Sequence, residues 1–160
     1  MMILGIIILL IIDIVSKIIV SKNLFVGETI PIIKNFFNIT YVRNTGVAWS
    51  MLSDKIYIIL TISGLIILLI GYYVYKNRPK AKLERLAYSL ILSGAIGNFI
   101  DRVIYGYVID FFDFYIFGYN YPIFNLADTF IVMGIIMLII VTWRNDKNED
   151  RSRIRGSKNR

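Results

Sequence analysis

Aspartate is the residue type with which this sequence is best equipped to do chemistry. The sequence contains no histidine and no cysteine, which excludes a His or Cys zinc site, a Ser-His-Asp triad and a cysteine nucleophile. Two neighbouring carboxyl groups share a proton, so that one acts as base and the other as acid near neutral pH. Such a pair hydrolyses a peptide bond by activating a water molecule, and we therefore expect neither a metal nor another cofactor.

Three aspartates within or beside hydrophobic segments are the candidates. Asp101 lies near the end of SGAIGNFIDR, Asp110 lies in YVIDFFDF, and Asp128 lies in FNLADTF. A charge inside a membrane span costs about 2.5 to 3.5 kcal/mol, so an aspartate in such a segment must have a structural or functional role. For Asp128 the structural alternative is that its carboxyl group is neutral and hydrogen-bonded. We expect Asp128 about one and a half turns, roughly 8 Å, inside its span, and one of Asp110 and Asp113 to be solvated.

The segment SGAIGNFIDR combines small and polar residues on one helix face. Gly94, Asn98 and Asp101 are spaced at i, i+4 and i+7, and Gly94 and Gly97 allow a neighbouring helix to approach closely. Polar side chains here would be wasted if they faced lipid. We favour an interhelix polar clamp for Asp101, in which it pairs with Arg102.

Two further polar motifs allow a structural or a functional interpretation. Asp13 and Lys17 are four residues apart, so they share a helix face, and the pair either neutralises itself or holds a polar group of a substrate. A serine nucleophile is disfavoured, because Ser16 lies on a different face from its neighbour Lys17. Asn44 and Gly46 mark a turn, which is either a loop that enters the membrane or part of a site.

Four hydrophobic runs must position these residues. They extend over about 2–20, 56–75, 86–104 and 123–143. Each contains about 20 residues, enough to cross roughly 30 Å of hydrocarbon as a helix. Because the third run ends on the side where the fourth begins, the three candidate aspartates are expected at one membrane face. The first run carries Asp13 and Lys17 and lacks a small-residue cleavage site, so we interpret it as a retained span.

The net charge of +7 indicates the orientation of the spans. The loop at 76–85 carries five basic residues and one acid, and the tail at 144–160 carries seven basic residues and three acids. Both are therefore expected in the cytoplasm, together with the N-terminus, and no nucleic-acid partner is expected. We predict one membrane domain over residues 1–145 and a basic, disordered tail over 146–160.

Two segments are predicted on the outer side, at 21–55 and 105–122. In the first, the sequence FFNITYVRN alternates and is rich in β-formers, which predicts a short strand or hairpin. The second is dense in aromatic residues, which is typical of a belt at the lipid–water interface. These residues are Tyr105, Tyr107, Phe111, Phe112, Phe114, Tyr115, Phe117, Tyr119 and Tyr121.

Five short motifs on this frame resemble one known family. They are the D-x-x-x-K motif beginning at Asp13, the N-x-G-x-A motif from Asn44 to Ala48, GAIGNFIDR, VIDF and FNLAD. In this order, over about residues 10–140, they resemble the lipoprotein signal peptidases, the type II signal peptidases of bacteria. Each motif is short, but five in order on four spans make the match specific.

The resemblance implies an aspartyl endopeptidase of the bacterial cytoplasmic membrane. The family cleaves signal peptides from prolipoproteins just before a cysteine that carries diacylglycerol, and it is the target of globomycin. The catalytic dyad would be Asp110 and Asp128, near the extracytoplasmic face. The supporting residues would be Asp13, Lys17, Asn44, Gly46, Asn98, Asp101, Arg102 and Asn125.

The resemblance also implies an architecture and a set of partners. The fold class would be an all-α membrane protein, with four transmembrane helices, a small extracytoplasmic β-cradle and an interfacial amphipathic segment. Residues 21–55 and the aromatic loop would supply the last two parts. We expect prolipoprotein substrates and membrane lipids as partners of a monomer, with an apolar groove between spans for the acyl chains.

Two other classes of function remain open at this stage. A transporter or binder would use the carboxylates for a cation or a proton, and the Asp13–Lys17 pair favours it. Transporters often contain internal repeats and carry ionisable groups near the midplane, whereas this sequence has no repeat and its acids gather toward one face. A purely structural membrane subunit would need the aspartates for stability alone.

Overall fold

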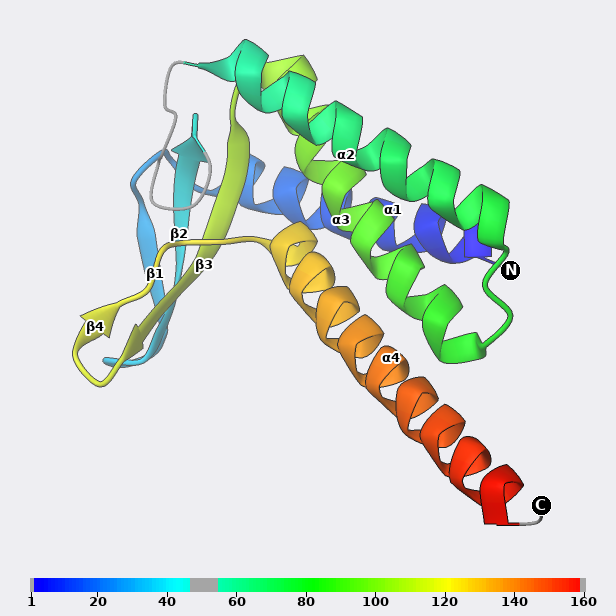
Figure 1. Cartoon of the computed structure of the whole chain (residues 1–160). Coiled ribbons are helices and arrows are strands. Elements are labelled where there is room, and N and C mark those ends of the chain that lie inside the picture. Colours follow the sequence, from blue (N-terminus) through cyan, green and yellow to red (C-terminus); the bar gives the residue numbers. More distant parts are fainter. Residues whose placement is uncertain (1, 47–54, 159–160) are drawn as a thin grey trace.

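A computed structural model of the chain describes residues 2–46 and 55–158, so that Ala48 of the N-x-G-x-A motif lies outside the described residues. The helices are α1 (Met2–Asn23), α2 (Ile56–Asn77), α3 (Lys82–Tyr105) and α4 (Leu126–Lys158). The strands are β1 (Thr29–Ile33), β2 (Phe37–Asn44), β3 (Val108–Ile116) and β4 (Tyr119–Asn120). Figure 1 shows the strands as a small sheet at one end of the helices.

Three helices are long and apolar enough to cross a membrane. They are Met2–Asn23, Ile56–Asn77 and the Leu126–Arg144 part of α4, as the hydrophobic runs predict. A helix also occupies the third predicted span, but α3 does not reach this level of hydropathy. The reason is its place in the bundle: α3 packs against α1, α2 and α4, and ten of its residues are buried. A helix that its neighbours cover needs little apolar surface.

The glycines of α3 allow this close packing, as predicted. A Cβ at Gly97 would collide with a carboxylate oxygen of Asp13 on α1, and a Cβ at Gly94 would collide with the carbonyl oxygen of Ala127 on α4. Any larger residue at these positions would push one of the two neighbouring helices away. The two glycines therefore bring the polar residues of α1, α3 and α4 together.

Helix α4 begins later than the sequence predicts. The Asn125 side chain accepts a hydrogen bond from the Asp128 backbone N–H (3.0 Å), and a carboxylate oxygen of Asp128 accepts one from the Asn125 N–H (3.1 Å). This reciprocal pair is a capping box, which sets the helix start at Leu126 rather than 123. The prediction that Asp128 lies one and a half turns inside the span was therefore wrong, because Asp128 lies in the first turn.

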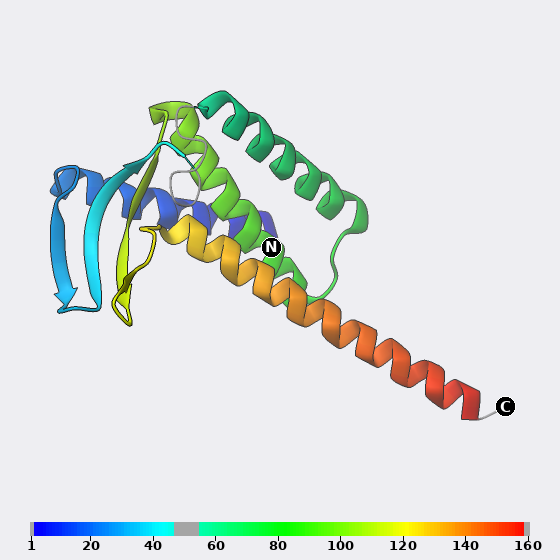
Figure 2. The ribbon, with the colours of Figure 1, turned by 60° about the vertical axis from the view of Figure 1, so that its left-hand side comes forward.

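The other end of α4 also differs from its prediction. The structure continues the helix through Lys158, across most of the tail predicted to be disordered from 146 onward. This part of the chain has few helix breakers. A helix already formed through the span extends into such a sequence without a new nucleus. Figures 1 and 2 show this part of α4 extending beyond the other helices.

The sheet is antiparallel with the order β1-β2-β3-β4. The strand predicted from FFNITYVRN is confirmed as β2, and the aromatic loop at 105–122 forms β3 and β4. One face of the sheet packs on the end of α1 through a buried cluster: Val20, Leu24, Tyr41, Ile109 and Phe111. Among the aromatic residues of the 105–122 segment, Phe114 stacks on Phe37 of β2 and on Phe124.

The turn between β3 and β4 carries a strained residue. Phe117 and Gly118 both have positive φ angles, 51° and 78°, between the paired residues Ile116 and Tyr119. A two-residue turn of this kind favours Asn-Gly, and a left-handed L-residue costs about 1–2 kcal/mol. We expect Phe117→Asn to raise the thermal unfolding midpoint in detergent. Phe117→Ala removes the same ring but keeps the strain, and an equal rise in that control would contradict the explanation.

Candidate active site

Asp110 lies on β3 and is held between two asparagine amides. The strand register places it opposite Val42 of β2, and its side chain is buried, with 2% exposure. The Asn125 side-chain amide donates to Oδ1 at 2.7 Å, and the Asn44 amide donates to Oδ2 at 2.9 Å. Both carboxylate oxygens are therefore oriented by neutral donors from different parts of the chain.

Asp128 lies in the first turn of α4 and is held in the same way. The Asn98 amide from α3 donates to Oδ1 at 2.7 Å, while Oδ2 accepts the capping hydrogen bond from the Asn125 N–H. The Asn125 side-chain amide also donates to Asn98 Oδ1 at 3.1 Å. Asn125 thus contacts both Asp110 and Asp128, and it fixes the two carboxyls relative to each other.

Lys17 lies at the centre of a buried ionic cluster beside this site. Its ammonium group lies 2.8 Å from Asp13 Oδ2 and 3.0 Å from Asp101 Oδ2, and it donates to Asn98 Oδ1 at 3.0 Å. These three acceptors match the three protons of the ammonium group. Asp13 also accepts a hydrogen bond from the Ala127 N–H at 3.0 Å, which satisfies a free donor at the start of α4. The predicted Asp13–Lys17 pair is confirmed.

The predicted pair between Asp101 and Arg102 is wrong. Consecutive helical residues point about 100° apart. Asp101 consequently faces Lys17 and the Ile109 N–H, whereas Arg102 donates to two backbone carbonyls. These carbonyls belong to Gly46 (2.8 Å) and Asn98 (3.3 Å), so Arg102 ties the turn after β2 to α3.

The structure brings all ten residues predicted from the sequence into one contiguous network. The remaining link is Gly46, whose N–H donates to Asn44 Oδ1 at 3.0 Å. The members are Asp13, Lys17, Asn44, Gly46, Asn98, Asp101, Arg102, Asp110, Asn125 and Asp128. They come from α1, α3, α4, β2 and β3 and from the ends of these elements, so only the folded chain assembles them.

The expectation that one of Asp110 and Asp113 is solvated was also wrong. Both are buried, at 2% and 3% exposure. Asp113 accepts hydrogen bonds from Thr40 Oγ1 at 2.7 Å and Asn38 Nδ2 at 3.4 Å, both on the paired strand β2. The alternating polar residues Asn38 and Thr40 were the sequence feature that could have indicated a buried acceptor. That this acceptor is Asp113 follows only from the register between β2 and β3.

The carboxyls of the network fall into two groups. Asp13 and Asp101 form ion pairs with Lys17. Within residues 2–46 and 55–158, neither Asp110 nor Asp128 has a cation at ion-pair distance, and both are held by amides. The same residues contain no cluster of three or more side chains arranged to hold a metal ion. Neutral donors, rather than a cation, therefore hold Asp110 and Asp128 in place.

Burial, and to a smaller extent the neighbouring charge of Asp128, raises the pKa of Asp110 from 3.8 to about 7. Between pH 4 and 7 the unfolded chain therefore ionises at this residue while the folded chain stays protonated, which costs stability as the pH rises. Asp110→Asn removes this cost. We expect the thermal midpoint of the variant, relative to the parent, to increase from pH 4 to 7 and then to level off. A difference independent of pH would contradict the raised pKa.

The model of one family, described as "Signal peptidase (SPase) II", matches residues 5–144. This chain belongs to the signal peptidase II family. It is thus a member of a family of peptidases, and its three apolar helices indicate a membrane protein.

Curated relatives agree with the family match. Three proteins named lipoprotein signal peptidase are similar over 89% of this chain. The protein from Clostridium tetani is 43% identical and is covered over 92% of its length, and that from Clostridium acetobutylicum is 42% identical and covered over 94%. The protein from Staphylococcus aureus is 38% identical and covered over 88%.

Two solved structures, each described as a bacterial membrane enzyme, share the fold. The first, determined at 2.3 Å, has a TM-score of 0.85 and 39% identity, with coverage of 92% of this chain and 90% of that chain. The second, determined at 1.9 Å, has a TM-score of 0.80 and 40% identity, with coverage of 88% and 91%. The family assignment and the observed fold are therefore consistent with each other.

Proposed function

We propose that this protein cleaves the signal peptide of prolipoproteins that carry diacylglycerol, just before the lipidated cysteine, with Asp110 and Asp128 as an aspartic dyad. Membership of the signal peptidase II family supports the substrate, as do relatives named lipoprotein signal peptidase. The division of the buried carboxyls supports the dyad. Lys17 pairs with Asp13 and Asp101, whereas amides hold Asp110 and Asp128, which would therefore share one proton.

The dyad would act by general acid–base catalysis. The ionised carboxylate takes a proton from a water molecule, whose oxygen then attacks the scissile carbonyl carbon. The protonated partner donates a hydrogen bond to the oxyanion that develops. As the C–N bond breaks, a proton passes from a carboxyl group to the leaving amine, which leaves one proton again shared by the pair. This sequence of steps needs no group other than the two carboxyls and the water.

The neighbouring residues would orient the dyad rather than react. Asn125 contacts both carboxyls, and Asn44 and Asn98 each hold one of them, so the three amides keep the oxygen atoms in place. Asp13 supports the first turn of α4, in which Asp128 lies. Lys17 connects this support to Asn98 and α3.

We further propose the topology predicted from the charges. Helix α3 would be the fourth span, tolerated in the membrane because the other helices cover it. Both termini and the basic loop between α2 and α3 would lie in the cytoplasm. The dyad and the sheet would then lie at the extracytoplasmic side, where water and an unwound peptide can enter, and the protein would act as a monomer among membrane lipids.

The structure weakens the case for a transporter. The feature that favoured it, the Asp13–Lys17 pair, belongs to a buried cluster in which the ammonium group also pairs with Asp101 and donates to Asn98. Lys17 has 2% exposure and Asp13 has none, so neither offers a charge to a passing ion. The peptidase interpretation accounts for the remaining two carboxyls as well.

A cleavage assay tests the proposed substrate. Detergent-purified protein is mixed with a diacylglyceryl-modified prolipoprotein and, separately, with the same precursor lacking the lipid. Mass spectrometry identifies the two products of each reaction. We expect release of the signal peptide from the modified precursor only. Equal cleavage of the two precursors would refute the requirement for the lipid, and cleavage of neither would refute the proposed activity.

A further inference from the structure

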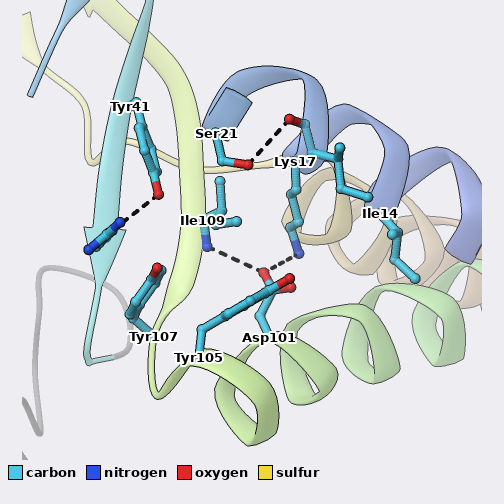
Figure 3. Close-up of a pocket in the computed structure, with 10 residues that line it drawn as sticks. Ile14, Lys17, Ser21, Tyr41, Asp101, Tyr105, Tyr107 and Ile109 are labelled. Carbon is cyan, nitrogen blue, oxygen red and sulfur yellow. Dashed lines mark hydrogen bonds and ion pairs between the residues drawn. The ribbon is translucent and has the colours of Figure 1, made fainter. Parts of the chain in front are cut away.

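A polar pocket of about 170 Å³ lies where α1 and α3 meet the sheet (Figure 3). This volume would hold roughly five water molecules or a small polar group. Its polar lining comes from Lys17 and Ser21 of α1, Asp101 and Tyr105 of α3, and Tyr41 and Tyr107 of the sheet region. Arg43 of β2 also lines it, and isoleucines complete the wall.

The pocket is separate from the Asp110–Asp128 pair, although Lys17 and Asp101 of the surrounding network line it. Ile109 lines the pocket, and the next residue on β3 is Asp110. Successive side chains of a strand point to opposite faces, so the pocket and the Asp110 carboxyl lie on opposite sides of β3. A ligand in the pocket would therefore occupy neither the dyad nor the position of a scissile bond beside it.

Arg43 is the cation that the pocket can offer to a ligand. Lys17 is unsuitable, because it is buried, with 2% exposure, and its ammonium group already pairs with Asp13 and Asp101 and donates to Asn98. Arg43 is exposed; its Nε donates to the Tyr41 hydroxyl at 3.1 Å, and its guanidinium carbon lies 4.8 Å from the centre of the Tyr107 ring. These contacts hold the guanidinium against aromatic rings and, within residues 2–46 and 55–158, leave its terminal nitrogens free for an anion.

Asp101 supplies a hydrogen-bond acceptor in the same pocket. Its Oδ2 is bonded to Lys17 and to the Ile109 N–H, whereas Oδ1 has no hydrogen-bond partner in the described part of the chain. The side chains of Tyr105 and Ser21 add hydroxyl groups to the lining. The pocket thus combines a cation with a carboxylate oxygen, which suits a ligand that carries both an anion and a donor.

The depth of the pocket matches the headgroup layer of a membrane. Ser21 lies two residues before the end of α1, and Tyr105 is the last residue of α3. The end of a spanning helix lies at the level of the lipid phosphates. We propose that the pocket binds a phospholipid headgroup, with its phosphodiester on Arg43 and a terminal N–H or O–H donor directed toward Asp101. Ethanolamine and glycerol headgroups carry such a donor, whereas choline does not.

Native mass spectrometry of the full-length protein in detergent tests this proposal with phosphatidylethanolamine, phosphatidylglycerol and phosphatidylcholine. We expect one molecule of either of the first two to be retained, and no comparable retention of phosphatidylcholine. Arg43→Gln should weaken retention by about tenfold, because a charge-assisted hydrogen bond is lost. The matched control Lys34→Gln removes an exposed basic residue from the turn between β1 and β2, outside the pocket, and it should bind like the parent.

Each other result overturns the proposal. Equal retention of phosphatidylcholine would show that the headgroup donor is not recognised. Unchanged lipid retention by Arg43→Gln would show that the guanidinium does not bind the phosphodiester. Equally tight binding of deacylated glycerophosphoethanolamine would overturn the assignment to a membrane lipid. The variant Arg43→Lys keeps the charge but not the planar guanidinium group. The proposal predicts that its lipid retention is weaker than that of the parent and stronger than that of Arg43→Gln. Because the readout is lipid retention, the result does not depend on the proposed dyad.

Discussion

Asp110→Asn and Asp128→Asn are each expected to reduce cleavage of a diacylglyceryl-modified prolipoprotein by about 10³-fold or more. An amide can neither take a proton from water nor supply one to a leaving amine, and general acid–base catalysis of this kind contributes about 10²- to 10⁴-fold per group. Loss of either carboxyl also removes the shared proton. The measurement is kcat/KM for signal-peptide release by detergent-purified variants, with thermal unfolding of each variant recorded in parallel.

Asp113→Asn is the matched control for this prediction. Asp113 lies on β3, like Asp110, and is buried to the same extent. Its carboxylate accepts hydrogen bonds from Thr40 and Asn38, not from the amides of the candidate site. We expect the variant to keep cleavage within a few-fold of the parent. Near-normal cleavage by either dyad variant would show that the dyad is wrongly assigned. A comparable loss in Asp113→Asn would point to a general effect of charge on the sheet.

Lys17→Met is expected to cause the largest loss of stability in the chain. It leaves Asp13 and Asp101 buried, with 0% and 4% exposure, and without their cation. Removing one partner of a buried ion pair typically costs about 3–5 kcal/mol, since an uncompensated charge remains inside. The thermal unfolding midpoint in detergent should fall markedly, and the start of α4 should loosen because Asp13 supports it.

Two further variants make the cause of this loss measurable. Adding Asp101→Asn to Lys17→Met removes one of the two uncompensated charges, and it should recover part of the lost stability. Lys22→Met removes a lysine from the last turn of the same helix, where it is exposed, and should change the midpoint little. An unfolding midpoint for Lys17→Met equal to that of Lys22→Met would mean that the buried pair contributes nothing.

Local patterns in the sequence were sufficient for several parts of the fold. Three apolar helices, the strand β2 and the Asp13–Lys17 pair follow from composition, alternation and i, i+4 spacing, each of which involves residues close in the chain. Within the apolar runs, the few polar residues were also recognisable as candidates for a structural or functional role. The resemblance to signal peptidase II rested on these polar motifs, and the family match confirmed it.

Two of the failed predictions depend on neighbours that are distant in the sequence, and one does not. The start of α4 depends on a local capping box between Asn125 and Asp128, which hydrophobic periodicity does not reveal. The partner of Asp101, in contrast, depends on which helix faces α3. Asp113 is buried because β2 pairs with β3 in one register. The low hydropathy of α3 likewise reflects its cover by other helices, which a window of residues cannot reveal.

Local sequence was thus enough to single out the polar residues of the network and three apolar helices, because the cost of burying a charge and helical spacing are properties of short stretches. Which carboxyls Lys17 neutralises was decided in part by the folded chain. Asp13 follows from i, i+4 spacing within α1, whereas the packing of α1 against α3 brings Asp101, rather than Asp110 or Asp128, to ion-pair distance of Lys17. A charge is compensated only by groups within a few ångströms, and those distances exist only once the helices and strands have packed.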